Sequence, residues 1–180
     1  MNARPSTQPD LTELGAVYRS EVRALYGFLW RSGAQEADMQ DLVHDVFLTA
    51  ARRWESYDRR RPVRPWLFGI AFRVLSDSRR KRGSSAVGQL EVPVATDQGG
   101  DEVVALRQAQ ALMQRALATL SEERRVAFVL VELEGLSVRE AAELMSAPVP
   151  TTYSRVTQAR DEVAQAVRRF ELVAEARRPT

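Results

Sequence analysis

The chain has 180 residues, of which 44% are hydrophobic and 28% charged, with a formal net charge of +2, so it can form one domain or two small ones. It contains no cysteine and one histidine, which excludes disulfides and thiolate metal sites and argues against a histidine metal site; no cofactor is expected. No apolar run approaches the roughly 18 residues that cross a bilayer, and residues 1–10 hold no apolar signal segment, so we expect a cytoplasmic protein without membrane insertion.

The N-terminal segment predicts one long amphipathic helix. Residues 1–9, which include two prolines and small polar residues, are expected to be a disordered lead. Asp10 and Glu13 have the spacing of a capping box, which predicts a helix from about Leu11 to Ser32 that ends at Gly33. The apolar residues on one face of this helix are Leu14, Tyr18, Val22, Leu25 and Leu29.

The next helix, predicted over Met39–Trp54, carries two different faces. At about 100° per residue its apolar side chains form one broad face, made of Met39, Leu42, Val43, Val46, Phe47, Ala50 and Trp54. Asp38, Asp41 and Asp45 form an acidic stripe beside it. Charge pattern alone indicates an ordinary solvated helix surface for this stripe. His44 is interpreted as a surface residue without chemistry.

The segment from residue 52 to 82 is strongly basic. It holds eleven basic residues against three acidic ones, a net +8 in a chain whose total is only +2. Residues 56–62 form a charged turn, and Pro65 suits the first turn of a third helix whose buried side begins with Trp66. The opposite side of that helix, lined by Gly69, Arg73, Ser76 and Arg80, is a plausible DNA-binding face.

Aromatic rings accompany this positive charge. Guanidinium groups neutralise phosphates and rings stack on unpaired bases, so the pattern favours a nucleic-acid surface. Its candidate residues are Trp54, Tyr57, Arg59, Arg60, Arg61, Arg64, Arg73 and Arg80. Periodicity also places Trp54 partly, and Trp66 mainly, in the core.

Residues 83–101 differ from the segments on either side. They contain four glycines and Pro93, no basic residue, and three acidic residues as their only charges. This composition predicts a flexible acidic linker between a domain of residues 10–82 and a second domain of residues 102–180.

The second domain has the pattern of a helix-turn-helix. Helical periodicity returns at Glu102, and Ser121 is expected to cap a further helix that ends at Gly135. Ser137 and Glu140 predict a capping box for a short helix over Val138–Met145, and Pro150 begins the last helix after a tight turn. The buried face of the last helix is predicted as Thr152, Val156, Ala159, Val163, Val167 and Phe170. On its other side, Thr151, Ser154, Arg155 and Gln158 are candidates to reach major-groove edges and phosphates.

Two runs of residues resemble one protein family. The run Asp38-Met39-Gln40-Asp41-Leu42-Val43-His44-Asp45-Val46-Phe47, followed by Arg64-Pro65-Trp66-Leu67-Phe68-Gly69-Ile70-Ala71, resembles the core-binding and promoter-melting domain of bacterial extracytoplasmic-function (ECF) sigma factors. The run Leu120–Leu130, with Glu134-Gly135-Leu136-Ser137-Val138-Arg139-Glu140-Ala141-Ala142, resembles their domain that reads the upstream promoter element. Both modules occur in the family's order.

The resemblance implies a non-enzymatic, all-α sigma factor whose partners are core RNA polymerase, promoter DNA in duplex and single-stranded form, and an anti-sigma factor. It implies that Asp38, Asp41 and Asp45 dock on polymerase, with Leu42 and Phe47 adding apolar contact or supporting the helix from behind. The basic aromatic segment would capture unpaired bases of the minus-ten element, and the last helix would read the duplex minus-thirty-five element.

The sequence departs from the family at three informative positions. Ser146 replaces a turn glycine, Tyr153 replaces a usual lysine or arginine, and Arg73 stands where asparagine is common. The resemblance therefore predicts the architecture of the chain but not the promoter sequence that it recognises. The rival interpretation is a free-standing helix-turn-helix regulator that does not bind core polymerase, with a metal-dependent nuclease as a more distant third.

Overall fold

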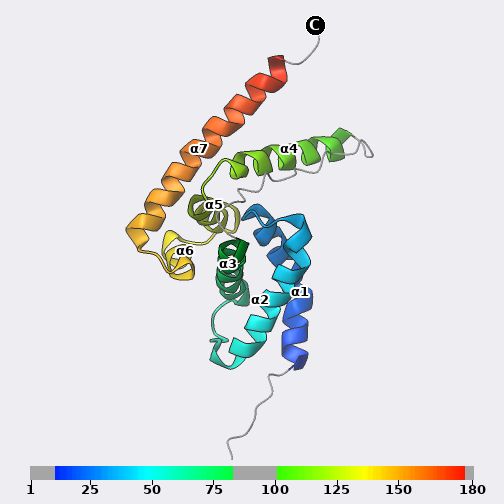
Figure 1. The fold of residues 1–180 in the computed structure, drawn as a ribbon, viewed down its shortest axis with the longest axis vertical. Helices are drawn as coiled ribbons and strands as arrows, with labels where there is room; N and C mark the ends of the chain where they lie inside the picture. Colours follow the sequence, from blue (N-terminus) through cyan, green and yellow to red (C-terminus); the bar gives the residue numbers. More distant parts are fainter. Residues whose placement is uncertain (1–10, 83–100, 177–180) are drawn as a thin grey trace, which may run out of the picture.

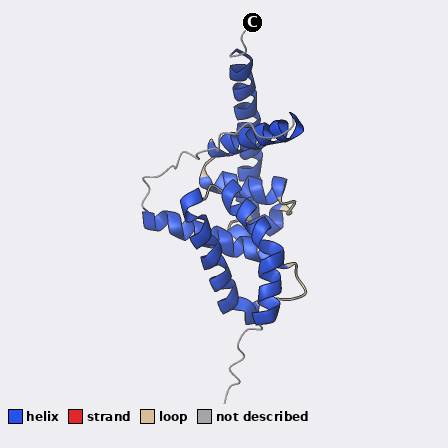
Figure 2. Ribbon diagram, turned by 90° about the vertical axis from the view of Figure 1, so that its right-hand side faces the viewer, coloured by secondary structure: helices blue, strands red, loops and turns tan. Residues whose placement is uncertain are grey.

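The computed structural model describes residues 11–82 and 101–176, and all regular structure in these ranges is helical (Figure 2). The first range contains α1 (Leu11–Arg31), η1 (Glu36–Asp38), α2 (Met39–Arg53), η2 (Trp54–Ser56) and α3 (Val63–Arg82). The second contains α4 (Asp101–Ala118), α5 (Glu122–Phe128), the π-helical turn η3 (Val129–Leu133), α6 (Val138–Met145) and α7 (Val149–Ala176). The all-α prediction is confirmed. The expected disordered lead, the capping residue Asp10 and nearly all of the predicted linker lie outside the described residues.

The N-terminal half is a bundle of α1, α2 and α3 (Figure 1). Phe28 of α1 stacks on Phe68 of α3, with ring centroids 4.5 Å apart, at the centre of a core that α2 closes with its apolar face. Gly33 ends α1 as predicted: its φ is 91°, and the next amide, of Ala34, donates to the carbonyl of Leu29 at 3.0 Å. None of the 15 residues of α2 is proline or glycine, which suits the regular helix it forms.

The C-terminal half packs α4, α5 and α6 against α7. The helix predicted from Ser121 to Gly135 is present, but it is α-helical only as far as Phe128 and continues as the π-helical turn η3. In this wider turn the amide of Glu134 donates to the carbonyl of Val129, five residues back, at 2.9 Å. Gly135, with φ of 74°, follows that turn. Two ion pairs, Arg124–Glu162 and Arg160–Glu132, each 2.6 Å, fix α5 and η3 to α7.

The helix-turn-helix is formed by α6 and α7. The Ser137 hydroxyl accepts from the amide of Glu140 at 3.2 Å, and the amide of Ser137 donates to the Glu140 carboxylate at 2.8 Å, so the predicted capping box is confirmed. Ser146 ends α6 with φ of 51° and ψ of 42°, the left-handed conformation that glycine adopts without cost. The final helix begins at Val149, one residue before the predicted start, and α3 begins at Val63, two residues before Pro65.

The two halves also pack against each other. α3 contacts α6 as well as α1 and α2, and Figure 1 shows it between α2 and α6. Buried apolar residues of both halves therefore form one continuous cluster. The helix predicted to carry a DNA-binding face lies at the junction of the halves.

Candidate functional site

The acidic stripe of α2 is a solvent-facing surface with an apolar support behind it. Asp41 and Asp45 are exposed and Asp38 is half-buried, whereas Leu42 and Phe47 are only 3% and 9% exposed. The two apolar residues thus pack behind the acidic stripe, in the core of the N-terminal half. Among the described residues, no ion pair engages Asp41 or Asp45. Both carboxylates are available to a basic partner.

Sequence reasoning missed one residue of this surface. Leu48 is 40% exposed and follows Asp41 by seven positions and Asp45 by three, so it lies on the same side of α2. The seven-residue spacing from Asp41 could have identified Leu48 in the sequence. This side of α2 therefore presents two carboxylates and an adjoining apolar side chain to solvent.

The aromatic residues between α2 and α3 form a stacked cluster. The Tyr57 ring lies 4.7 Å from Trp66 and 5.4 Å from Trp54, and the two tryptophans are 5.8 Å apart. Trp54 is 2% exposed and its indole nitrogen donates to Glu13 at 3.3 Å, so it belongs to the core. This corrects its inclusion among the candidate DNA-contacting residues, because a buried ring cannot stack on a base. Tyr57 and Trp66 are half-buried and present the accessible part of the cluster.

The Tyr57 hydroxyl is held within its own turn. It donates to the backbone carbonyl of Arg61, and burial, followed by the charges of Asp58 and Glu13, raises the pKa of the phenol above its usual value of 10.0. The phenol is therefore neutral at physiological pH. A neutral ring with a fixed hydroxyl is a suitable stacking platform beside phosphates.

The candidate arginines of the basic segment are all engaged within the protein. Arg59 pairs with Glu13 at 3.2 Å, Arg60 with Asp58 at 3.0 Å and Arg64 with Glu21 at 2.6 Å. Arg80 pairs with Asp77, Arg61 lies 3.7 Å from Glu143, and Arg73 donates to the Ser146 hydroxyl at 3.3 Å. Exposed pairs of this kind contribute only about 0–1 kcal/mol each, so phosphates can replace the carboxylates.

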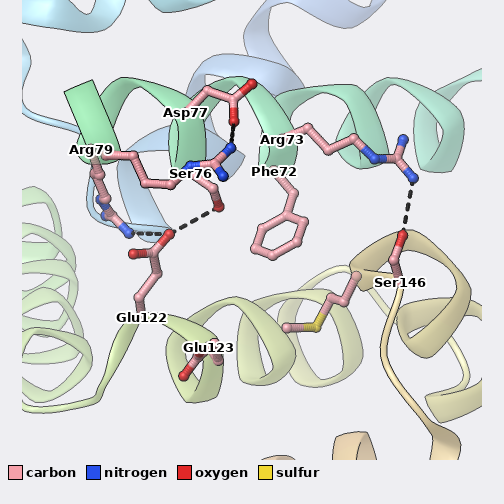
Figure 3. Close-up of a pocket in the computed structure, with 10 residues that line it drawn as sticks. Phe72, Arg73, Ser76, Asp77, Arg79, Glu122, Glu123 and Ser146 are labelled. Atoms are coloured by element: carbon pink, nitrogen blue, oxygen red, sulfur yellow. Dashed lines mark hydrogen bonds and ion pairs between the residues drawn. The ribbon is translucent and has the colours of Figure 1, made fainter.

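The α3 face predicted to bind DNA lies in a groove between α3 and the helices α5 and α6 (Figure 3). Gly69 is buried against Leu144 of α6. Ser76 and Arg79 both reach the carboxylate of Glu122, at 3.1 and 3.0 Å. The C-terminal half therefore covers the part of this face around Gly69 and Ser76, while Arg73 and Arg80 remain exposed.

The candidate residues on α7 are presented differently. Thr151, Ser154 and Gln158 are exposed on one side of the helix, while Thr152 is fully buried and its hydroxyl donates to the carbonyl of Pro148 at 3.2 Å. Arg155 is half-buried, 3.8 Å from Glu123. Tyr153 is 62% exposed, so the ring that replaces the family's usual cation is also on the surface.

Comparison with known proteins decides the family. The model of sigma-70 region 2 matches residues 17–85, and that of sigma-70 region 4 matches residues 110–163. The RNA polymerase sigma factor CnrH of Cupriavidus metallidurans is 32% identical over 142 residues, which cover 73% of this chain and 74% of CnrH. The chain belongs to the ECF family of RNA polymerase sigma factors. The ECF RNA polymerase sigma-E factor of Escherichia coli K12 is 27% identical over 157 residues, 81% of this chain and 80% of the relative.

Solved structures agree on the fold of this sigma factor. RpoE of Bartonella quintana, in its complex with the anti-sigma factor NepR, has a TM-score of 0.68 at 23% identity and covers 87% of this chain and 97% of its own. CnrH, in its complex with the cytosolic domain of CnrY, has a TM-score of 0.62 at 24% identity, covering 87% and 88%. As a sigma factor the protein binds core RNA polymerase and directs transcription initiation, and the free-standing regulator is not favoured.

The sigma factor family is a family of non-enzymatic transcription initiation factors. No helix in the described ranges is long and apolar enough to span a bilayer.

Proposed function

We propose a division of labour between the two halves of this sigma factor. Residues 10–82 dock on core polymerase and capture unpaired bases of the minus-ten element, while residues 102–180 read the duplex minus-thirty-five element. The observation that carries the proposal is the pairing of opposite surfaces on one bundle: unpaired carboxylates on α2, and arginines around the Tyr57 and Trp66 rings at its far end. The two charges suit different partners, a basic protein surface and a nucleic acid.

Docking rests on Asp41 and Asp45, with Asp38 and Leu48 beside them. Leu42 and Phe47 hold the helix in place from the core, where Phe47 also packs on Tyr18 with ring centroids 4.7 Å apart. Charges of this kind orient and accelerate docking more than they add affinity. A basic surface of core polymerase is their expected counterpart.

Promoter opening follows from differential affinity. Tyr57 and Trp66 can stack on an unpaired base only when the strands have separated, and the neighbouring arginines bind the phosphates of that strand. Binding the melted state better than the duplex shifts the equilibrium toward opening without nucleotide hydrolysis. The energy therefore comes from binding alone.

The C-terminal half supplies the duplex contact. Thr151, Ser154 and Gln158 are exposed on the second helix of a helix-turn-helix, the element that enters the major groove, with Arg155 beside them. Duplex reading holds the promoter while the other half captures the strand.

An anti-sigma protein is a further proposed partner. RpoE of B. quintana and CnrH were each solved with such a protein or with a cytosolic partner domain, and this chain shares their fold. Because the proposed partner polymerase works in the cytoplasm, we place the sigma factor there too.

The experiment is a binding titration of the full chain with sigma-free core polymerase. Asp41→Arg with Asp45→Arg should reduce core affinity at least about a hundredfold, since two attractive contacts become repulsive. Asp161→Arg with Glu171→Arg is the matched control, because both residues are exposed on α7 and the change in net charge is the same. Equal core affinity of the two double variants would remove the docking assignment.

A further inference from the structure

The exposed side of α7 is divided into a polar part and an apolar edge. The polar part consists of Thr151, Ser154 and Gln158, whose hydroxyl and amide groups suit hydrogen bonds to base edges. The apolar edge consists of Val149 and Tyr153, which are 44% and 62% exposed. Hydrogen bonds to bases use the polar part only, so the apolar edge calls for a partner of different chemistry.

Helix geometry brings the residues of the apolar edge together. Val149 and Tyr153 are four positions apart, so they lie one above the other at the beginning of α7, next to the end of α6 (Figure 1). Thr157, four positions further along and also exposed, continues this row with its methyl group. The core of the C-terminal half is formed without the row, because it buries Thr152 and Val156 instead.

The Tyr153 ring stands at the surface beside a fixed cation. In the described ranges no other aromatic ring stacks on it. Arg160, seven positions further along the same side of α7, donates from Nε and Nη2 to Glu132 of η3 at 3.0 and 2.6 Å. The hydrogen bond to Glu132 and then the charge of that carboxylate raise the pKa of Arg160, and the Tyr153 phenol contributes in the same direction. The phenol therefore lies near a guanidinium group that η3 holds in place.

The chemistry of the major groove identifies a partner for the apolar edge. Base pairs present hydrogen-bond donors and acceptors in this groove, and the C5-methyl group of thymine is the apolar group among them. The side chains of the polar part match the donors and acceptors, whereas an aromatic ring beside an isopropyl group matches the methyl. Both kinds of side chain occur in the first turns of α7, the part of a recognition helix that reaches base edges.

We propose that Tyr153, with Val149 beside it, is a specificity-determining residue that reads the C5-methyl group of a thymine in the minus-thirty-five element. The inference rests on the proposed function, which places α7 in the major groove of that element. Contact with the ring removes the methyl group from water and so favours thymine at one position of the element. The apolar edge thus adds a discrimination that the hydrogen bonds of the polar part do not make.

Replacement of thymine by deoxyuridine tests this contact, because it removes the methyl group and leaves the hydrogen bonds of the base pair in place. Holoenzyme, assembled from core polymerase and the full chain, first selects its upstream sequence from promoter DNA that is randomised over the minus-thirty-five element. Each thymine of the selected sequence, on either strand, is then replaced singly by deoxyuridine, and holoenzyme binding is measured. We expect one replacement to weaken binding about three- to fivefold, the effect of leaving one methyl group without its apolar contact.

Variants of the apolar edge connect this effect to its residues. Tyr153→Ala should weaken binding of the thymine duplex by at least the same factor and should abolish the deoxyuridine effect, because the two changes remove the same contact. Tyr153→Phe keeps the ring and should behave like the unmodified chain. Val149→Ala shortens the adjoining side chain and should reduce the deoxyuridine effect to about twofold. Tyr26→Ala, at a tyrosine of α1 that is 43% exposed, is the matched control and should leave the effect unchanged.

Three outcomes would overturn the methyl contact, once circular dichroism has shown that each variant is folded. The first is a deoxyuridine effect of the same size in Tyr153→Ala and in the unmodified chain. The second is a selected element that contains no thymine, or one in which no thymine responds to the replacement. The third is a loss of affinity in Tyr153→Phe as large as that in Tyr153→Ala, which would assign a hydrogen bond to the phenol hydroxyl in place of the methyl contact.

The selection step separates this inference from the proposed function. A holoenzyme that selects no upstream sequence would remove duplex reading by α7 and thymine reading with it. A holoenzyme that selects a defined upstream sequence, binds it less well with Arg155→Ala, and is indifferent to deoxyuridine would overturn thymine reading alone.

Discussion

The two surfaces proposed to contact DNA are presented in opposite ways. On α7, Thr151, Ser154 and Gln158 face solvent. On α3, the side that carries Arg73 and Arg80 lies partly against α6 and, through Glu122, against α5, although both arginines are exposed. The difference has an electrostatic cause: Glu122 and Glu143 face the arginines of the N-terminal half, while the three exposed α7 residues carry no charge to attract a cover. The proposed duplex-reading surface is thus open along α7, whereas part of the α3 surface is covered by the other half.

The largest expected effect is a loss of stability at Trp54, which links the core to the Tyr57 and Trp66 rings proposed to bind the separated strand. Trp54→Ala should destabilise the protein by about 3–5 kcal/mol, because a fully buried tryptophan leaves a large cavity. Chemical denaturation followed by circular dichroism measures the loss. The cause is the burial of this ring at 2% exposure, together with its contacts to Tyr57 and Trp66.

Trp66→Ala is the matched comparison for Trp54. Its ring is half-buried, so its removal should cost less stability and should instead weaken binding of a single-stranded minus-ten oligonucleotide. Equal stability losses for the two variants would contradict the separation into a core ring and a surface ring.

On the open surface, Arg155→Ala should weaken duplex minus-thirty-five binding about tenfold, within the roughly 1–3 kcal/mol of a good base contact. Single-stranded minus-ten binding should be unchanged, because Arg155 lies in the other half. Arg168→Ala, an exposed arginine further along α7, is the control. An identical duplex affinity for Arg155→Ala and the unmodified chain would count against the recognition role.

Local sequence signals predicted most of the helices and much of each surface. The stop at Gly33, the capping box of Ser137 and the buried face of α7 each depend on residues a few positions apart, and each was found. The packing of the C-terminal half on the N-terminal half was not predicted, because it joins residues far apart in the chain. Arg31 and Glu134, for example, are 103 positions apart. Periodicity identifies a polar face but not the segment that packs on it.

Trp54 illustrates the same limit at a single residue. Its place at the end of the apolar stripe predicted partial burial, and its neighbouring arginines predicted a DNA contact. The structure buries it fully, because Glu13 of α1 accepts from the indole nitrogen and satisfies the only polar group of the ring. That partner lies 41 positions away, beyond any local pattern.

A smaller effect is expected at the cap of α6, the helix that belongs to both the helix-turn-helix and the junction. Ser137→Ala should cost about 1 kcal/mol of stability, since one backbone donor loses its acceptor. Hydrogen bonds from the Ser137 side chain and then from its backbone lower the pKa of Glu140 below its usual 4.5. The pKa is lower in the folded state, so this contribution is complete above pH 4.5 and is lost as pH falls through the folded value.

Denaturation at several pH values measures both parts of that prediction. The unmodified chain should lose stability more steeply below pH 4.5 than Ser137→Ala, which has already lost the hydrogen bond from the Ser137 side chain. Ser154→Ala, an exposed serine on α7, controls for removal of a hydroxyl. Parallel acid profiles for Ser137→Ala and the unmodified chain would show that the Ser137 side chain does not depress the Glu140 pKa.

The smallest effect concerns Ser146, where local strain and the junction oppose each other. A left-handed backbone at φ of 51° costs a non-glycine residue about 1 kcal/mol, so Ser146→Gly should relieve strain at the end of α6. Glycine also gives the unfolded chain more freedom, which reduces the net gain in stability to a few tenths of a kcal/mol. The same change removes the hydroxyl that accepts from Arg73, so the halves should separate slightly more often.

Ser146→Asn separates the two contributions, because asparagine tolerates the left-handed conformation and keeps an acceptor for Arg73. Thermal unfolding should rank Ser146→Gly and Ser146→Asn at or above the unmodified chain. The chain has no cysteine, so dyes on Ala16→Cys and Ala164→Cys, both at exposed positions, report the separation of the halves by energy transfer, which should fall only for Ser146→Gly. If both variants leave transfer unchanged, the Arg73 contact does not help to hold the halves together, and their packing depends on the Leu144 contact with Gly69 and on the ion pairs of Glu122, Glu134 and Glu143.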